Sequence, residues 1–316
     1  MAGTSGTVQR RFPRSFVSFH PMAVDSRPVM SDTTPAVETR PPQSGRPSTP
    51  AYRRTPGFEL AIWPLALVLA LFIAVPLLAL VWRTVQYGAD ATAGTVTAFR
   101  QALSLSLVTT AIAMLVIVLL GTPLAYVLAR RPFPGRWLVD TLVDLPIVLP
   151  PAVAGIALLM AFGRRGVLGG TLADWGVTIP FTAAAVVMAQ IFVAAPFYIR
   201  AARSGFDRVE PDLEAAAADL GARPGTVFRT ITLPLARPGL TAGAVLAWAR
   251  ALGEFGATIM FAGNLAGTTR TMPLAIYGEY GSGDLPAALL LAILLLATSV
   301  AILLVSRFLG RERARH

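Results

Sequence analysis

The sequence predicts an all-α membrane protein with six transmembrane helices and with both chain termini in the cytoplasm. Three observations support this prediction: the composition, the length of the apolar segments and the distribution of arginine. Hydrophobic residues make up 54% of the 316-residue chain and charged residues only 14%, whereas roughly a quarter of a typical soluble domain is charged. This balance favours a chain that lies largely within a lipid bilayer.

The apolar residues fall into six blocks, each near the roughly 20 residues that an α-helix needs to cross a bilayer. The predicted spans are 60–82, 104–128, 141–162, 181–202, 239–261 and 285–308. The third contains Pro146, Pro150 and Pro151. We therefore expect it to be kinked or interrupted, with neighbouring helices or water satisfying the freed backbone groups.

Residues 1–56 have a different composition, rich in Pro, Ser, Thr and Arg and without a long apolar run. Such a segment cannot bury enough surface to offset the entropy of the chain, so we expect it to be disordered. It also lacks the apolar core of a signal peptide. The sequence thus predicts a disordered cytoplasmic N-terminal segment, 1–56, and a transmembrane domain, 57–316.

Arginine sets the orientation, because the chain has no lysine and all 27 basic residues are arginine. A cytoplasmic N-terminus places on the cytoplasmic side Arg130, Arg131, Arg136, Arg200, Arg203, Arg208, Arg223, Arg229, Arg237, Arg307, Arg311, Arg313 and Arg315. The opposite side then holds only Arg83, Arg100, Arg164, Arg165 and Arg270. This asymmetry follows the positive-inside rule. We attribute the net charge of +10 to topology and anionic lipid, and we expect no nucleic-acid partner.

A polar, alanine-rich segment lies between the fourth and fifth spans. It contains Glu214-Ala-Ala-Ala-Ala-Asp-Leu-Gly221 and, nine residues later, Ile231-Thr-Leu-Pro234. Ala and Leu favour a helix, and Gly221 stands where a short helix can end in a left-handed cap. Pro234 and Pro238 suit the start of the next helix. The segment therefore predicts a cytoplasmic helix–turn–helix, which can dock a rigid partner and follow its movement.

Small residues recur at every fourth position of the fifth span: Gly239, Gly243, Ala247 and Ala251. Such a stripe allows another helix to approach closely, so we favour a packing role over contact with a ligand.

Arg250 and Glu254 stand four residues apart in the same span, which would place them on one helix face. A charge near the bilayer centre costs about 2.5–3.5 kcal/mol on insertion scales, so it normally faces a partner or a wet cavity. Two interpretations remain open. The pair either locks helices together or lines a path along which an anion could cross the membrane.

Missing residue types exclude several chemistries. Without cysteine there is no disulfide or thiolate site, and the two histidines, His20 and His316, fall in the expected tails. We therefore expect no metal, cofactor or catalytic triad. Without lysine the chain cannot carry a standard phosphate-binding P-loop. If ATP drives this protein, another subunit hydrolyses it, and the chain itself is not an enzyme.

The segment around Gly221 resembles the EAA loop of ABC importer permeases, in which a glycine is followed after nine residues by Ile-x-Leu-Pro. One departure is clear, because the glutamate position of that family falls on Ala215 and Glu214 stands one place early. The resemblance implies an ATPase-coupling loop, residues 207–236. Its expected contact positions are Glu214, Ala215, Ala216, Gly221, Ile231, Leu233 and Pro234.

Two further segments, Ala249-Arg-Ala-Leu-Gly-Glu-Phe-Gly-Ala-Thr258 and Gly267-Thr-Thr-Arg-Thr-Met-Pro-Leu-Ala-Ile-Tyr277, are similar to the permease subunits of molybdate ABC importers. Sulfate permeases share the Gly-Glu-Phe-Gly-Ala core but usually diverge after it. The similarity extends over residues 100–310. It implies the six-helix type I importer fold in a bacterial inner membrane. It also implies a second permease copy, a dimer of ATP-binding subunits and an extracytoplasmic protein that binds molybdate or tungstate.

Three alternatives remain at this stage. A sulfate or thiosulfate importer would share the architecture, because the binding protein would make most of the choice of anion. An ATP-independent carrier or channel would have no use for the Gly221 loop. A membrane-embedded enzyme would need clustered His, Cys or paired carboxylates, whereas Glu254 is the only acidic residue deep in the late spans.

Overall fold

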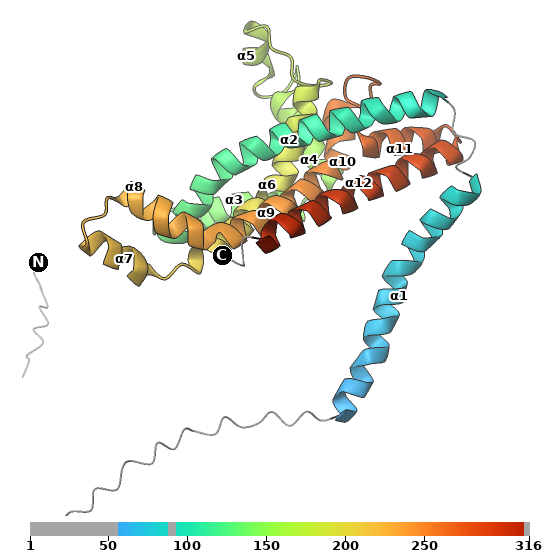
Figure 1. Ribbon diagram of the computed structural model, residues 1–316. Helices are drawn as coiled ribbons and strands as arrows, with labels where there is room; N and C mark the ends of the chain where they lie inside the picture. The colour runs from blue at the N-terminus through green and yellow to red at the C-terminus, as the bar shows by residue number, and fades with distance from the viewer. Residues whose placement is uncertain (1–55, 88–92, 313–316) are drawn as a thin grey trace, which may run out of the picture. The chain divides into compact units, whose positions relative to one another are not determined.

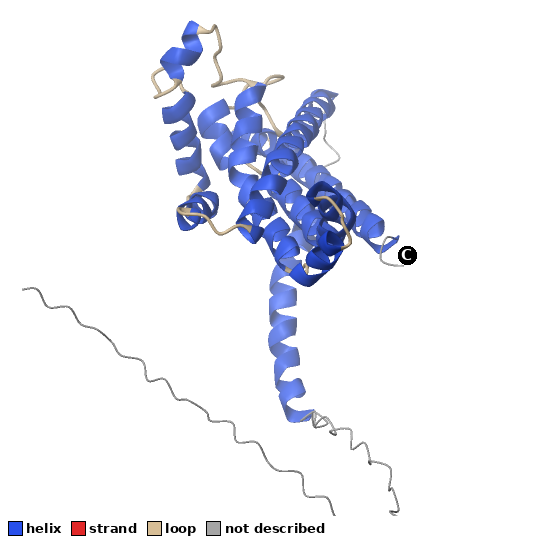
Figure 2. Cartoon of the chain, turned by 90° about the vertical axis from the view of Figure 1, so that its left-hand side faces the viewer, coloured by secondary structure: helices blue, strands red, loops and turns tan. Residues whose placement is uncertain are grey.

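The structure is a computed structural model that describes residues 56–87 and 93–312. Figure 2 shows helices joined by loops, and the described part of the chain contains no strand. The helices labelled in Figure 1, together with the π-helical turn η2, are α1 (Pro56–Tyr87), α2 (Ala93–Arg130), α3 (Arg136–Val148), α4 (Pro151–Phe162), α5 (Gly169–Asp174), α6 (Ala183–Asp207), α7 (Pro211–Asp219), α8 (Pro224–Val227), η2 (Phe228–Thr232), α9 (Leu233–Leu252), α10 (Gly256–Ala262), α11 (Met272–Gly281) and α12 (Leu285–Glu312). The predicted all-helical membrane class is confirmed. The expected disordered segment, 1–56, lies outside the described residues up to Pro56, where α1 begins.

Four helices are individually long and apolar enough to cross a bilayer: α1, α2, α6 and α12. α9 and α10 pass the same test together, although they are bent by 55° at a short break. The remaining predicted span, 141–162, is divided into α3 and α4. The chain is therefore a multi-pass membrane protein, but the described residues hold four candidate spans, or five if the bent α9–α10 pair counts as one, rather than the six predicted. The prolines explain the difference, because they leave α3 and α4 too short to pass as spans.

The break between α3 and α4 follows from the prolines. Leu149 has extended backbone angles, φ −67° and ψ 132°, which is the conformation that a residue before proline prefers. Pro150 is the N-cap of α4 and Pro151 lies in its first turn, where a helix does not need the missing N–H. Pro146 remains inside α3.

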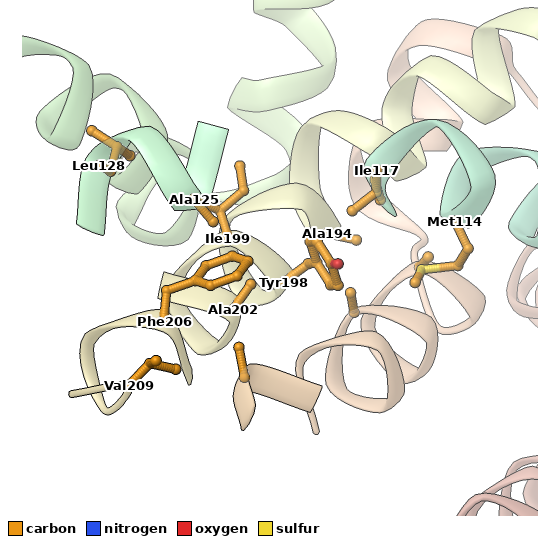
Figure 3. Close-up of a cluster of buried hydrophobic side chains, with 13 residues drawn as sticks. Met114, Ile117, Ala125, Leu128, Ala194, Tyr198, Ile199, Ala202, Phe206 and Val209 are labelled. Carbon is orange, nitrogen blue, oxygen red and sulfur yellow. The ribbon is translucent and has the colours of Figure 1, made fainter. Parts of the chain in front are cut away.

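α6 is the centre of the main apolar core, because it packs against both α2 and α9. Buried side chains from the three helices meet in one cluster, in which Figure 3 shows Met114 and Leu128 of α2 near Tyr198 and Phe206 of α6. The Tyr198 hydroxyl lies 2.6 Å from Thr122 Oγ1. The buried phenol therefore keeps a hydrogen-bond partner, as a tyrosine in a core requires.

The stripe of small residues on α9 lies against α6. A Cβ atom added to Gly239 would lie 2.5 Å from the Cα of Gly205, and one added to Gly243 would lie 3.0 Å from atoms of α6. Ala247 and Ala251 are buried in the cluster shared with α6. Larger side chains at the two glycines would push the helices apart, because packed interiors have no spare volume.

α10 has its own core against α4 and α6. Ala154, Val186 and Phe261 are buried together there. A Cβ atom added to Gly155 would lie 2.6 Å from the carbonyl oxygen of Ala257. Both halves of the α9–α10 span thus pack against α6, but α10 in addition packs against α4.

Ion pairs fix α3 to the end of α6. Arg203 Nη1 lies 2.6 Å from Asp140 Oδ1, and Arg200 Nε lies 2.8 Å from Asp144 Oδ1. These side chains are partly exposed, so each pair contributes only modestly to stability. Their main effect is to place α3 close to the connection that leads into the coupling loop.

Candidate coupling and translocation site

The first helix of the coupling loop, α7, ends in a defined turn at Gly221. The Gly221 amide donates to the Ala218 carbonyl at 2.9 Å, and the Ala222 amide donates to the Ala217 carbonyl at 3.0 Å. This Schellman pattern needs a left-handed residue, and Gly221 has a φ of +86°. A Cβ atom added to Gly221 would meet nothing within 4 Å. The backbone angle, rather than lack of space, therefore favours glycine here.

One face of α7 is open and largely apolar. Ala215 and Ala216 are exposed, and the neighbouring Leu213 and Leu220 are 46% and 90% exposed. Leu213, Ala216 and Leu220 stand three and four residues apart, so they share one side of α7 and its C-terminal turn and form an exposed apolar strip of the kind found at protein interfaces. This is the part of α7 that a partner can reach.

Glu214 points inward and ties α7 to two other elements. Its Oε1 accepts a hydrogen bond from Thr232 Oγ1 at 2.6 Å and lies 3.4 Å from Nη2 of Arg130. The same Arg130 nitrogen donates to the Val209 carbonyl at 2.6 Å, just before α7. Arg130 is the last residue of α2 and Thr232 the last of η2. These contacts join α7 to the end of α2 and to the run leading into α9.

The helix after the turn begins earlier than predicted. The sequence favours Pro234 and Pro238 as its start, whereas the helical run begins at Pro224 and continues through α8, η2 and α9. In η2 the Leu233 amide donates to the Phe228 carbonyl, five residues back. This wider turn accommodates Pro234, which has no N–H for the regular ladder.

The residues of the Ile-x-Leu-Pro motif lie where η2 passes into α9. Ile231, Leu233 and Pro234 are half-buried. Beside them the Phe228 ring meets the Tyr126 ring of α2 edge to face, with centroids 5.1 Å apart. The aromatic contact and the Glu214 hydrogen bonds anchor η2 to the same end of α2.

The fifth predicted span is not one continuous helix, which corrects the prediction for Glu254. α9 ends at Leu252 and α10 begins at Gly256, so Glu254 lies in the break rather than on a helix face. The physical reason is local. Gly253 has little helix preference, and the Glu254 side chain bonds to the backbone of the following turn instead of allowing the helix to continue.

Glu254 organises both sides of this break. Its Oε1 accepts a hydrogen bond from the Ala257 amide at 2.8 Å, in the first turn of α10. Its Oε2 forms an ion pair with Arg250 Nη1 at 2.6 Å, in the last turn of α9. Only 1% of the Glu254 side chain is exposed. A buried carboxylate needs such partners, because an unpaired charge would be very costly there.

Gln190 of α6 supports the break from the neighbouring helix. Its Nε2 donates to the Ala251 carbonyl at 3.2 Å and to Thr110 Oγ1 of α2 at 3.1 Å. The Ala251 carbonyl, in the last turn of α9, also accepts a hydrogen bond from the Glu254 amide at 3.2 Å. Side chains thus satisfy backbone groups on both sides of the break, as non-helical backbone at membrane depth requires.

Arg250 is the more accessible member of the pair, with 28% of its side chain exposed. A guanidinium carries five N–H donors, and the contact with Glu254 uses only part of this set. The arrangement can present a positively charged group in a fixed position to an anion while binding that anion only weakly. No cluster of metal-ligating side chains occurs in the part of the chain that the structure describes.

Sequence reasoning missed Arg130, Thr232 and Gln190. Gln190 had a usable signal, because it is a polar residue inside an apolar span and such residues are normally paired. Arg130 and Thr232 gave no comparable signal, since their bonds to Glu214 depend on how distant helices pack.

Comparisons with known proteins agree with this arrangement. Residues 121–315 match the family described as binding-protein-dependent transport system inner membrane component. The molybdenum transport system permease protein ModB of Mycobacterium bovis is 46% identical over 235 residues, which cover 74% of this chain and 88% of ModB. The sulfate transport system permease protein CysT of Salmonella typhimurium is 36% identical over 274 residues, which cover 84% of this chain and 98% of CysT.

A solved structure supports the fold. The crystal structure of a bacterial alginate ABC transporter, in complex with its alginate pentasaccharide-bound periplasmic protein, matches with a TM-score of 0.66 and 18% sequence identity. The match covers 81% of this chain and 94% of that chain. The family match spans more than half of the sequence and includes the coupling loop, the α9–α10 break and α12. The chain therefore belongs to the family of binding-protein-dependent transport system inner membrane components.

Proposed function

We propose that this chain is the permease subunit of an ATP-driven ABC importer that moves molybdate or tungstate across the bacterial inner membrane. The observation that supports the transport mechanism most directly is Glu214, which links an exposed coupling helix to both α2 and η2. The choice of anion rests on the higher identity to a molybdenum permease, 46%, than to a sulfate permease, 36%.

The proposed complex contains a second copy of this chain, a dimer of ATP-binding subunits and an extracytoplasmic oxyanion-binding protein. The ATPase belongs to the partner, because this chain has no lysine for a P-loop. The exposed face of α7, with Leu213 and Leu220, is the surface that we assign to the ATP-binding subunit.

The proposed orientation places α7 and both termini in the cytoplasm. Its support is the arginine asymmetry, to which Arg130, Arg200 and Arg203 contribute. These three arginines belong to the end of the bundle that carries the coupling loop and α3. The loop between α10 and α11 then faces the binding protein outside.

In the proposed cycle, the loaded binding protein docks on the outer loops and ATP closes the two ATPase subunits. The movement reaches α7, and the Glu214 contacts pass it to α2 and to the helical run of α8, η2 and α9. The bundles then change from inward-open to outward-open. Arg250 offers a weak passing site on the anion path, while Glu254 keeps its position fixed.

The alternative that stays nearest is a sulfate or thiosulfate importer, supported by the 36% identity to CysT over most of the chain. An ATP-independent carrier or channel is the second alternative. Such a protein would need no docking helix, so it would not explain the exposed helix α7 or the contacts of Glu214 with Thr232 and Arg130.

The test is uptake by the purified complex in proteoliposomes, with its own binding protein outside and ATP inside. We expect uptake of radiolabelled molybdate to be blocked by unlabelled molybdate and tungstate but not by equal sulfate. Blocking by sulfate at the same concentration would assign the complex to the sulfate class instead.

A further inference from the structure

The loop between α10 and α11, residues 263–271, is a rigid turn. The amides of Thr268, Thr269 and Arg270 all donate to the Leu265 carbonyl at 3.0–3.1 Å. The Leu265 amide in turn donates to Thr269 Oγ1 at 3.0 Å. A loop with this many internal bonds holds its side chains in one position, as a binding element should.

Arg270 is held in place within this turn. Its Nε donates to Asn264 Oδ1 at 3.1 Å, and the Asn264 amide nitrogen donates to the Leu274 carbonyl of α11 at 3.1 Å. No carboxylate of the described residues forms an ion pair with Arg270, in contrast to Arg250. The two terminal nitrogens of Arg270 therefore keep their donors for a ligand.

The guanidinium borders a cavity of about 370 Å³ between this loop and the first turns of α2. Its polar lining includes Thr97, Gln101 and Arg270, and no acidic side chain of residues 56–87 or 93–312 lines it. Gly94 and Gly267 also line it and leave backbone within reach. The start of α2, a helix of 38 residues, adds a partial positive charge at the same place.

The walls of this cavity are fixed to each other. The Met272 amide, directly after the loop, donates to Ser106 Oγ of α2 at 2.8 Å. Ala102 of α2 is buried together with Met272 and Ala275 of α11. The cavity is therefore a feature of the packed helices and not of a free loop.

We propose that the Arg270 cavity receives the tetrahedral dianionic oxyanion when the binding protein releases it. The proposal rests on the proposed function, because it assumes the oriented importer described above. An arginine held at Nε offers paired donors that match oxyanion geometry. Its half-exposed position keeps the binding weak enough for the anion to move on toward Arg250.

The test compares Arg270→Gln with Arg100→Gln in the full complex. Arg100 is an exposed arginine on α2 next to Gln101 and does not line the cavity. We expect Arg270→Gln to reduce molybdate uptake roughly tenfold, the loss that one charge-assisted contact explains. The uptake rate of Arg270→Lys should lie between those of the wild type and Arg270→Gln, and the rate of Arg100→Gln should stay near that of the wild type. Docking of the ligand-free binding protein, measured separately, should be unchanged in Arg270→Gln.

Three results would overturn the proposal. Equal losses in the two Gln variants would indicate a diffuse field instead of a site. Weaker docking that accounts for the whole loss would show that Arg270 meets a carboxylate of the binding protein. Unchanged uptake in Arg270→Gln would show no role in transport. A wild-type complex that imports no oxyanion would refute the proposed function itself, which distinguishes that failure from a failure at Arg270.

Discussion

Two glutamates hold the functional region together, and they do so over very different distances in the sequence. Glu214 contacts Thr232 and Arg130, which are 18 and 84 residues away. Glu254 contacts Arg250 and the Ala257 amide, only four and three residues away. The first joins separate helices, whereas the second shapes one bent span.

The two glutamates also differ in exposure and in the distance to their arginine partners. Glu214 is 22% exposed and its arginine lies 3.4 Å away, while Glu254 is 1% exposed and its arginine lies 2.6 Å away. A contact between elements that can lengthen suits the transmission of movement. A short, buried, local contact suits a fixed shape. We therefore infer that Glu214 acts in coupling and Glu254 in holding the α9–α10 break.

The largest effect is expected at the buried pair. Glu254→Ala leaves Arg250 unmatched and the first turn of α10 without its acceptor, which should cost about 3 kcal/mol. The change should lower the yield and melting temperature of the complex more than the double change Arg250→Ala with Glu254→Ala does. Thermal melting of the purified complex measures this difference.

Uptake by the double variant then separates the two roles of Arg250. Good assembly with poor molybdate uptake would place the positive charge on the anion path. Good assembly with normal uptake would make the pair purely structural. Small, additive losses of stability in all three variants would contradict the burial of Glu254.

The second effect concerns coupling. Glu214→Ala removes the acceptor of Thr232 and Arg130, a loss of about 1–2 kcal/mol in the contact between elements. We expect the complex to assemble, but to import several-fold less molybdate for each ATP hydrolysed. Asp212→Asn, an exposed acid in the first turn of the same helix, is the matched control. If both variants keep the wild-type ratio, Glu214 is not a coupling residue.

The cap of α7 should give a smaller effect. Gly221→Val forces a branched side chain to a φ of +86°, at about 1–2 kcal/mol, although space is open there. Gly221→Asn tolerates this angle better, and Gly225→Val tests an equally open glycine without a positive φ. The amount of ATP-binding subunit that copurifies should fall for Gly221→Val and stay at the wild-type level for Gly225→Val. For Gly221→Asn it should lie between these two levels. Full association in Gly221→Val would refute the docking assignment of this loop.

The smallest effect is expected at the N-terminus. Deleting residues 1–50 should leave assembly and uptake unchanged, because the sequence predicts no packed element there. The shortened chain, purified with its ATPase, provides the comparison. A loss of complex would show that this segment has a partner of its own.

The sequence predicts local features better than distant ones. Apolar block length gave the spans, and the prolines near Pro150 indicated the division between α3 and α4. The break at Glu254 had a weaker marker, because Gly253 and Gly256 stand on either side of it, and glycines inside an apolar run are often tolerated within a helix. The tie from Glu214 to Arg130 depends on the packing of α2 beside η2, which no spacing in the sequence encodes.

The most direct test of the account is sided transport in proteoliposomes that contain the complete complex. The account predicts that molybdate accumulates against its gradient only with ATP on the side of α7. The loaded binding protein must be on the side of the 263–271 loop. Molybdate flux without ATP, or flux by the permease alone at a comparable rate, would contradict the account.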